Sequence, residues 1–530
     1  MNISIEDINM ANHPDFFQEH RLAKREKLYG EGINPYPYSF SVTHTINELH
    51  ENFESLEESQ TAITCYGRLL SSRKMGKSRF LDIIDRGRKI QLYVRAGESS
   101  EETVALLANL DIGDWIGVTG RMFRTKTGEP TIMVSNIELL GKAVADVPFG
   151  KIHDGTTSYT LSNIEVRRQK RYLDWITDPE SVKRFETRSR IISLIRRFME
   201  DKDFLEVDTP SLELVYGGAD ARPFKTNVWA LGGQEVYLNV SLELPLKRYI
   251  IGGFPRVFAI AKCFRNEGID ATHNPEFTLM EWYEAFTDYE EQMTRFEELT
   301  CHVVEHITGG LRITYNGREI DLTPPWKRIR IPDIIGELFG CEMDAIDRAA
   351  LEERIDSVMS DEKLSFIGIA REQYRKTLAA EPLGALVMDV VEHELEQSDR
   401  LWNPCFLCDH PRDISPLTKV KRGNPSFVER FEPHIAGFEI GNAYSELTDP
   451  IEQYDRFMAQ RSLEDDGKKK EMGKDYVAHP MDMDFVHAIA CGMPPTGGVG
   501  YGIDRLVMLL TDMESIRDVI PFPMRMGSGD

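Results

Sequence analysis

The sequence has few cysteines and no long apolar stretch. Its seven cysteines are an odd number scattered from Cys65 to Cys491, which argues against a disulfide framework and fits reduced thiols. The longest run without Asp, Glu, Lys or Arg, residues 485–503, contains five glycines and two prolines in 19 residues, so it does not predict a membrane-spanning helix. The first residues, MNISIEDINM, lack the apolar segment of a secretory signal. We therefore expect a cytoplasmic protein without a membrane segment.

Basic side chains are also in short supply, since 63 Lys and Arg face 87 Asp and Glu, and the formal net charge is −24. This acidic excess argues against nonspecific nucleic-acid binding, because phosphate groups would be repelled. One segment is an exception to this acidic excess, since residues 61–95 carry nine basic side chains and two acidic ones. With roughly 150 residues per domain, a chain of 530 residues predicts a multidomain globular protein of three or four units.

Residues 61–145 contain five short strand-like runs that predict a small closed barrel. Before them, a helix is expected within residues 11–33 and is ended by the prolines of residues 34–40, so residues 1–60 form a helical arm. The barrel is expected to be an OB-fold, with strands at residues 63–70, 79–85, 89–96, 115–123 and 131–140 and a helical stretch at residues 101–109. Phe80 and Tyr93 suit single-stranded nucleic acid, although the residues alone leave open whether these rings stack on bases or fill the barrel core.

The rest of the chain predicts a linker and a larger domain. Residues 146–178 are interpreted as a hinge, and residues 179–530 as one domain that opens with a helix capped by Asp178. A charged helical insertion is expected at about residues 330–400. Cys405 and Cys408 have the spacing of half a zinc site, but no second pair follows at ligand spacing, so two buried thiols are the favoured interpretation.

Polar side chains stand out in four strand-like segments of the larger domain. In residues 276–286, strict alternation places the acid Glu281 and the phenol Tyr283 on the same strand face. The side chains of interest in the four segments are Arg265, Asn266 and Glu267; Phe277, Leu279, Glu281 and Tyr283; Glu439, Asn442 and Glu446; and Arg505 after a glycine-rich strand. Without any resemblance to a family, the three acids Glu243, Glu281 and Glu446, which are expected on strands, are also compatible with a solvated face, and the arginines with surface salt bridges.

These segments resemble the motifs of class II aminoacyl-tRNA synthetases. FRNEG and HNPEFT within residues 257–286 resemble motif 2, GGVGYGIDR within residues 496–510 resembles motif 3, and the helix and strand of residues 183–212 resemble motif 1. The strings GGADARPF, LTPPWKRI, FEIGNAYSEL and GMPPTGG are similar to those of bacterial-type lysyl-tRNA synthetases. The resemblance covers the chain from about residue 20 onward. It implies a multidomain α+β fold, with an OB-fold anticodon-binding barrel and a catalytic domain whose antiparallel sheet is flanked by helices.

The resemblance also implies an activity. Such an enzyme activates L-lysine with ATP and Mg²⁺ to lysyl-adenylate and pyrophosphate, transfers lysine to the terminal adenosine of tRNA(Lys), and works as a homodimer through motif 1. Two alternatives are a synthetase-like lysine ligase that modifies a protein and a catalytically silent tRNA-binding paralogue. The barrel argues against the first alternative, and the intact polar motif residues argue against the second.

Roles for individual residues follow from the same resemblance. Arg265 and Arg505 are the expected catalytic residues, with Arg265 bridging the two substrates and Arg505 and Phe277 enclosing the adenine. The expected ATP-binding residues are Arg265, Glu267, His273, Asn274, Phe277 and Arg505. The expected lysine-binding residues are Gly218, Glu243, Arg265, Glu281, Tyr283, Asn442 and Glu446. Glu432 and Glu439 are the expected Mg²⁺ ligands. The expected anticodon-binding residues are Arg68, Phe80, Gln91 and Glu129.

Three details depart from the family pattern. The proline that usually precedes the acid at position 243 is found after it, as Pro245. Ala490 and Cys491 stand where an acid and an aromatic or histidine are common. Strict alternation would point Glu439 away from Asn442, so we predict a bend near Gly441 if both side chains act together.

Overall fold

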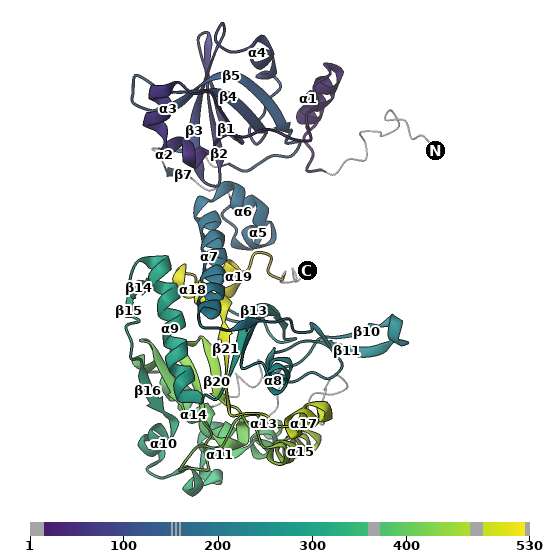
Figure 1. The fold of residues 1–530 in the computed structure, drawn as a ribbon, viewed down its shortest axis with the longest axis vertical. Coiled ribbons are helices and arrows are strands. Elements are labelled where there is room, and N and C mark those ends of the chain that lie inside the picture. The colour runs from purple at the N-terminus through teal and green to yellow at the C-terminus, as the bar shows by residue number, and fades with distance from the viewer. Residues whose placement is uncertain are drawn as a thin grey trace. The chain divides into compact units, whose positions relative to one another are not determined.

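The computed structural model describes residues 15–149, 152–153, 156–157, 161–358, 371–466 and 481–524 (Figure 1). The chain divides into two compact units, Met1–Arg184 and Phe185–Asp530. Among the helices that the structure describes, none is long and apolar enough to cross a membrane. The finer domain boundaries expected from the sequence, at residues 60, 145 and 178, stay predictions.

The first unit is built around a closed five-stranded barrel, which confirms the predicted strands. The strand order is β1-β2-β3-β5-β4, with β3 beside β5 in parallel, as in an OB-fold. The elements are β1 (Ile63–Met75), β2 (Ser78–Asp85), β3 (Arg88–Arg95), α4 (Glu101–Leu106), β4 (Trp115–Arg124) and β5 (Pro130–Gly141). Alternate residues such as Leu81, Leu92 and Val118 point inward and are fully buried, so side chains rather than a ligand fill the barrel.

Short helices accompany the barrel. α1 (Glu19–Gly30) lies within the predicted helix of residues 11–33, whose first residues fall outside the described part. The sequence analysis did not anticipate α2 (Ile46–Glu51) and α3 (Phe53–Ser59), although Thr45 and Glu48 form a capping box at the start of α2. The stretch interpreted as a hinge contains β6 (Ile152–His153), β7 (Thr156–Thr157), α5 (Ile164–Gln169) and α6 (Arg171–Thr177).

A nine-stranded sheet forms the frame of the second unit. Eight of its strands have the order β16-β17-β18-β20-β21-β13-β12-β8, and β19 pairs with β18. The pairs β16–β17 and β12–β8 are parallel, and the central strands are antiparallel. The strands are β8 (Leu205–Glu206), β12 (Arg256–Phe264), β13 (Glu276–Ala285), β16 (Lys327–Arg330), β17 (Cys405–Cys408), β18 (Arg430–Ile435), β19 (Phe438–Glu439), β20 (Gly441–Ser445) and β21 (Thr496–Gly502).

The two faces of this sheet carry different helices. α7 (Pro179–Asp201), α9 (Tyr289–Thr308) and α18 (Ile503–Leu510) supply the apolar core over the face that includes Met280 and Trp282. α8 (Glu243–Ile251) and α17 (Met483–Ala490) pack with Val257, Ala259 and Tyr283 on the other face. The alternation predicted for β13 is therefore confirmed, and the face bearing Tyr283 is the one that lines the candidate site.

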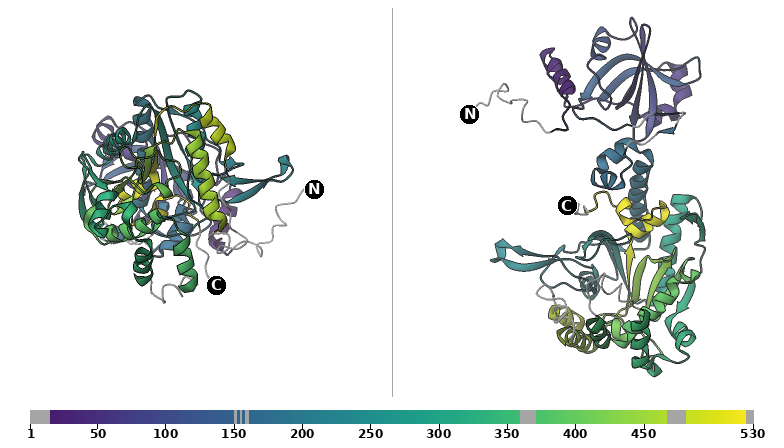
Figure 2. Two further views of the ribbon diagram at one scale, coloured as in Figure 1. Left: turned by 90° about the horizontal axis from the view of Figure 1, so that it is seen from below. Right: turned by 180° about the vertical axis from the view of Figure 1, so that it is seen from behind.

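The remaining elements surround this frame. The predicted insertion is helical in its described part, with α10 (Ile331–Phe339), α11 (Arg348–Val358), α13 (Arg371–Ala380) and α14 (Leu383–Glu396). β9 (Leu212–Glu213), β10 (Lys225–Val228) and β11 (Gln234–Leu238) form a small sheet whose hairpin extends away from the rest of the second unit (Figure 2). The others are β14 (Arg312–Tyr315), β15 (Arg318–Asp321), α15 (Pro450–Asp466) and α19 (Ile516–Val519). Cys405 and Cys408 are buried in β17, as predicted.

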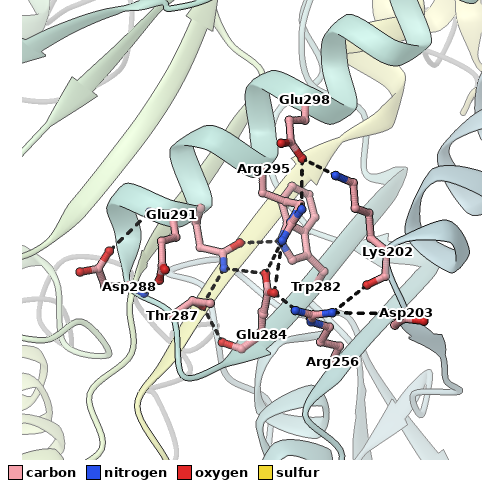
Figure 3. A network of polar contacts seen from close by, with 11 residues as sticks. Lys202, Asp203, Arg256, Trp282, Glu284, Thr287, Asp288, Glu291, Arg295 and Glu298 are labelled. Atoms are coloured by element: carbon pink, nitrogen blue, oxygen red, sulfur yellow. Dashed lines mark hydrogen bonds and ion pairs between the residues drawn. The ribbon is translucent and has the colours of Figure 1, made fainter.

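An ion-pair network fixes the end of β13 (Figure 3). The buried Glu284 receives Arg256 from β12 at 2.9 Å and Arg295 from α9 at 3.3 Å. Arg295 also contacts Glu298 at 3.1 Å, and Glu298 contacts Lys202 after α7 at 2.9 Å. Because two cations surround one buried carboxylate, the network ties β12, β13 and α9 together on the sheet face opposite the one that lines the site.

Candidate active site

One cavity of about 360 Å³ opens in the second unit and gathers nearly all the residues predicted for its chemistry. Residues of the strands β13, β18, β20 and β21 form its floor, and the turn after β12 forms one side. The predicted residues in its wall are Gly218, Glu243, Arg265, Glu267, His273, Asn274, Phe277, Glu281, Tyr283, Glu432, Glu439, Asn442 and Arg505. Glu446 lies just behind this wall, because a Cβ atom placed on Gly498 would overlap its carboxylate.

Arg265 occupies the position at which β12 ends. Its guanidinium carbon lies 5.1 Å from the centre of the Phe277 ring, a cation–π contact across the β12–β13 pair. Its Nε donates to the carbonyl of Val240 at 3.4 Å. The Arg265 side chain has no described salt bridge, so its charge faces the cavity and the surface salt-bridge interpretation is wrong for this residue.

Three carboxylates meet at the other end of the cavity. Glu281 accepts hydrogen bonds from Ser241 Oγ and from the Leu242 backbone N–H, both at 2.8 Å, and Tyr283 OH donates to it at 3.1 Å. Burial and the neighbouring charge of Glu243 raise the pKa of Glu281 to about 7, against the lowering effect of these hydrogen bonds. Glu243, Glu281 and Glu446 are all buried, so the alternative of a solvated acidic face is wrong.

Glu243 lies on a helix, and not on a strand as the sequence analysis assumed. It is the first residue of α8, and its Oε2 accepts a 2.6 Å hydrogen bond from Tyr444 OH. Pro245 falls in the first turn, where backbone N–H groups have no helical partner, so a proline is tolerated there. The displaced proline therefore leaves Glu243 in the cavity wall. The structure gives Ala490 no contact with the cavity, since it ends α17 and does not line the wall.

Glu432 and Glu439 line the cavity from β18 and β19. Arg430 donates to Glu432 at 2.6 Å, and His410 Nε2 lies 3.4 Å from it. Burial alone would raise the pKa of Glu432, but His410 and Arg430 outweigh burial and lower it well below its usual value. Glu432 is therefore ionised at neutral pH.

The predicted bend near Gly441 is confirmed. β18 pairs with β19 at His434↔Glu439 and with β20 at Phe431↔Ala443. Three steps along β18 are thus matched by four steps along its partner, which is one extra residue, as in a β-bulge. The extra residue allows Glu439 and Asn442 to line the same cavity.

Arg505 stands in the first turn of α18, as predicted. It donates to the Glu439 backbone carbonyl at 2.8 Å and to the Glu439 carboxylate at 3.2 Å. Its other nitrogen lies 3.3 Å from His273, whose Nδ1 contacts Asp270 at 2.8 Å. Arg505 therefore does form a salt bridge, but one within the cavity wall.

The barrel presents its predicted residues on the outer surface of the first unit. Phe80 and Tyr93 are half-buried, with ring centres 4.9 Å apart, and neither belongs to the barrel core. Arg68 lies over the Trp115 ring at 4.7 Å and donates to the Gly113 carbonyl at 2.8 Å. Gln91 accepts from Thr131 at 3.1 Å, and Glu129 is exposed before β5. The core interpretation of the two rings is thus wrong.

Comparisons with known proteins agree with this geometry. Residues 163–526 match the family described as tRNA synthetases class II (D, K and N), and residues 63–140 match the OB-fold nucleic acid binding domain. The chain is 42% identical to the lysine–tRNA ligase of Clostridium acetobutylicum over 97% of this chain and 94% of that protein. It is 43% identical to that of Shouchella clausii over 95% of each chain, and 40% identical to that of Clostridium perfringens over 98% and 99%. The chain belongs to the class II tRNA synthetases, in the lysine–tRNA ligase family.

Sequence reasoning missed two residues of the cavity wall, Arg430 and Tyr444, and one buried residue behind it, Lys247, in this class II synthetase. Arg430 donates to Asn442 at 3.0 Å as well as to Glu432, Tyr444 holds Glu243, and Lys247 is buried against Glu243 and Glu446. Only Arg430 had a signal, because it shares strand parity with Glu432. Tyr444 had none, because a tyrosine in an apolar strand is usually core.

Proposed function

We propose that this class II synthetase activates L-lysine with ATP and transfers it to tRNA(Lys). The observation that carries the proposal is the pairing, in one cavity, of Arg265 with a buried cluster of three carboxylates. Lysine brings one carboxylate and two ammonium groups, so its charges are complementary to those of the cavity. An aspartate pocket would need an unpaired cation at the acidic end, where Lys247, the cation that the described residues place there, is already held by two carboxylates.

Each end of the amino acid has a matching group. Arg265 and Asn442 receive the substrate carboxylate, since the amide of Asn442 lies within the same wall and is held by Arg430. Glu243, Glu281 and the Gly218 backbone receive the α-ammonium group. Glu446 and Tyr283 receive the ε-ammonium group at the closed end. Charge-assisted hydrogen bonds of this kind are stronger than neutral ones.

The nucleotide is held at the opposite end. Activation is an in-line attack of the lysine carboxylate on the α-phosphate of ATP, so the protein contributes mainly positioning and charge stabilisation. Arg265 bridges the carboxylate and the phosphate, and Phe277 and Arg505 enclose the adenine. Glu267, His273 and Asn274 bind the adenine edge and the phosphates. Arg265 and Arg505 are the catalytic residues of this scheme.

Glu432 and Glu439 have the chemistry that Mg²⁺ requires. Both are carboxylates in the cavity wall, and Glu432 is held ionised by its neighbours. The described residues contain no cluster of three His, Cys, Asp or Glu side chains able to hold a metal, so phosphate and water oxygens would complete the coordination. A bound Mg²⁺ would neutralise the phosphate charge.

The barrel supplies tRNA selection in this proposal. Phe80 stacks on an anticodon base, Gln91 hydrogen-bonds its edge, and Arg68 and Glu129 contact neighbouring groups. We further propose a cytoplasmic homodimer formed through the motif 1 segment, which includes α7.

Pyrophosphate exchange tests the proposal. With ATP and Mg²⁺, and each of the twenty amino acids in turn, lysine should drive exchange best, and exchange driven best by aspartate or asparagine would overturn the assignment. Arg265→Ala should then reduce the rate by about 10²-fold, the usual cost of losing one transition-state donor. Charging of tRNA(Lys) with labelled lysine separates a tRNA ligase from a protein-modifying ligase.

A further inference from the structure

A buried lysine side chain lies among the carboxylates of the cavity, and the proposed function gives it no task. The side chain of Lys247, on α8, is fully buried. Its Nζ lies 2.5 Å from Glu243 Oε1 and forms a second ion pair with Glu446 Oε2. The rings of Tyr444 and Phe485 lie 5.5 and 5.8 Å from the same nitrogen. The ammonium group is thus enclosed by carboxylates and aromatic rings.

Lys247 adjusts the charge of the acid cluster. When all three carboxylates are ionised, the one ammonium group of Lys247 leaves two uncompensated negative charges, which equals the number of ammonium groups on a lysine substrate. Burial alone would lower the pKa of Lys247, but the charges of Glu243 and Glu446 outweigh burial and raise it, so Lys247 stays charged. Without this cation, the cluster would hold one negative charge more than the substrate neutralises.

Lys247 also fixes the direction of Glu446. The ion pair holds Oε2, and Oε1 has no hydrogen-bond donor among the described residues. Oε1 faces Gly498 and the Tyr283 ring, which both line the cavity. A buried acceptor without a donor is unfavourable, so this oxygen favours a ligand that brings an N–H group.

We propose that Lys247 is a positioning residue for lysine recognition, acting through Glu446 and Glu243 and not by touching the substrate. It holds one oxygen of Glu446 so that the other faces the ε-ammonium group, and it reduces the cluster to the charge that lysine matches. The inference rests on the proposed activation of lysine.

The first test compares variants by lysine-dependent pyrophosphate exchange. Lys247→Met keeps the length of the side chain and removes its charge, and should raise the lysine KM on the order of 10- to 100-fold with little change in the ATP KM. Lys376→Met is the matched control, because Lys376 forms an exposed i,i+4 pair with Glu372 on α13 and is remote from the cavity wall. It should leave both constants unchanged.

Lys247→Arg keeps the cation, and therefore also serves if the uncharged variants do not fold. Its larger planar group does not fit the space of an ammonium ion, so it should raise the lysine KM by less than Lys247→Met does. An unchanged lysine KM in Lys247→Met, a lysine KM raised as much in Lys247→Arg as in Lys247→Met, or an ATP KM that rises in step with the lysine KM would overturn the proposal.

Chemical rescue separates charge from space filling. Lys247→Ala removes a fragment the size of n-propylammonium, so this ion should restore part of the lysine affinity, while 1-propanol of the same shape should not. Lys376→Met measures any inhibition by the added amine. Equal rescue by both compounds would show that Lys247 only fills space, and would also overturn the proposal. If the wild-type protein itself shows no lysine-driven exchange, the proposed function fails before any variant is compared.

Discussion

In the proposed lysine site, Glu281 would link pH to the binding of an ammonium group. Burial and the charge of Glu243 raise its pKa to about 7, so it takes up a proton near neutral pH. Below that pKa the protonated carboxyl has no charge to offer, and above it the carboxylate attracts the substrate. Glu281 therefore favours lysine binding only at a pH above its own raised pKa.

We therefore expect the lysine dissociation constant to fall as the pH rises from about 6 to about 8, with a proton released on binding. Isothermal titration in two buffers of different ionisation enthalpy measures both quantities. Glu281→Gln cannot titrate, and its lysine affinity should be weaker and less dependent on pH. A flat profile for the wild-type protein would contradict this account.

The strand β21 passes so close to the acid cluster that one of its positions has room only for glycine. A Cβ atom on Gly498 would overlap the Glu446 carboxylate and the Tyr283 ring. On Gly500, two residues along the same strand, the nearest atoms would be Asn442 O at 3.6 Å and Glu281 Cγ at 3.9 Å, which is ordinary contact.

Gly498→Ala should therefore raise the lysine KM by about tenfold or more, because Glu446 must move to make room. Gly500→Ala is the matched variant and should change the constant much less. Steady-state exchange kinetics at saturating ATP measure both. Equal effects of the two substitutions would indicate that β21 itself, and not the space beside Glu446, is disturbed.

Much of the element pattern could be predicted because its signals are local. The alternation of side chains correctly predicted that Phe277, Glu281 and Tyr283 lie on one face of β13. The five short strand-like runs correctly predicted the barrel. Glu243 was expected on a strand, because the apolar residues around it hide the start of α8. The burial of Lys247 had no sequence signal, since an isolated i,i+4 Glu–Lys pair usually indicates an exposed helix face. Only the fold brings Glu446, some 200 residues away, to its other side.

The molecule separates anticodon recognition from activation, because the barrel and the cavity belong to different units. Phe80→Ala should weaken tRNA(Lys) binding by about 1–3 kcal/mol, the value of one base stack, and leave lysine-driven pyrophosphate exchange intact. Filter binding measures the first quantity. Tyr38→Ala is the control, since this ring of the same unit is fully exposed and outside the barrel. Loss of exchange in Phe80→Ala would instead assign that ring a structural role.

The position of β21 in the sheet has a consequence for how the protein is made. β21 lies between β13 and β20, yet it is synthesised after every other strand of that sheet. Until residues 496–502 leave the ribosome, β13 and β20 each present an open edge of unpaired backbone groups. A nascent chain at that stage has no completed cavity for lysine or ATP, and its open edges invite pairing with other chains. Neither lysine nor ATP can therefore stabilise this intermediate before β21 has been made.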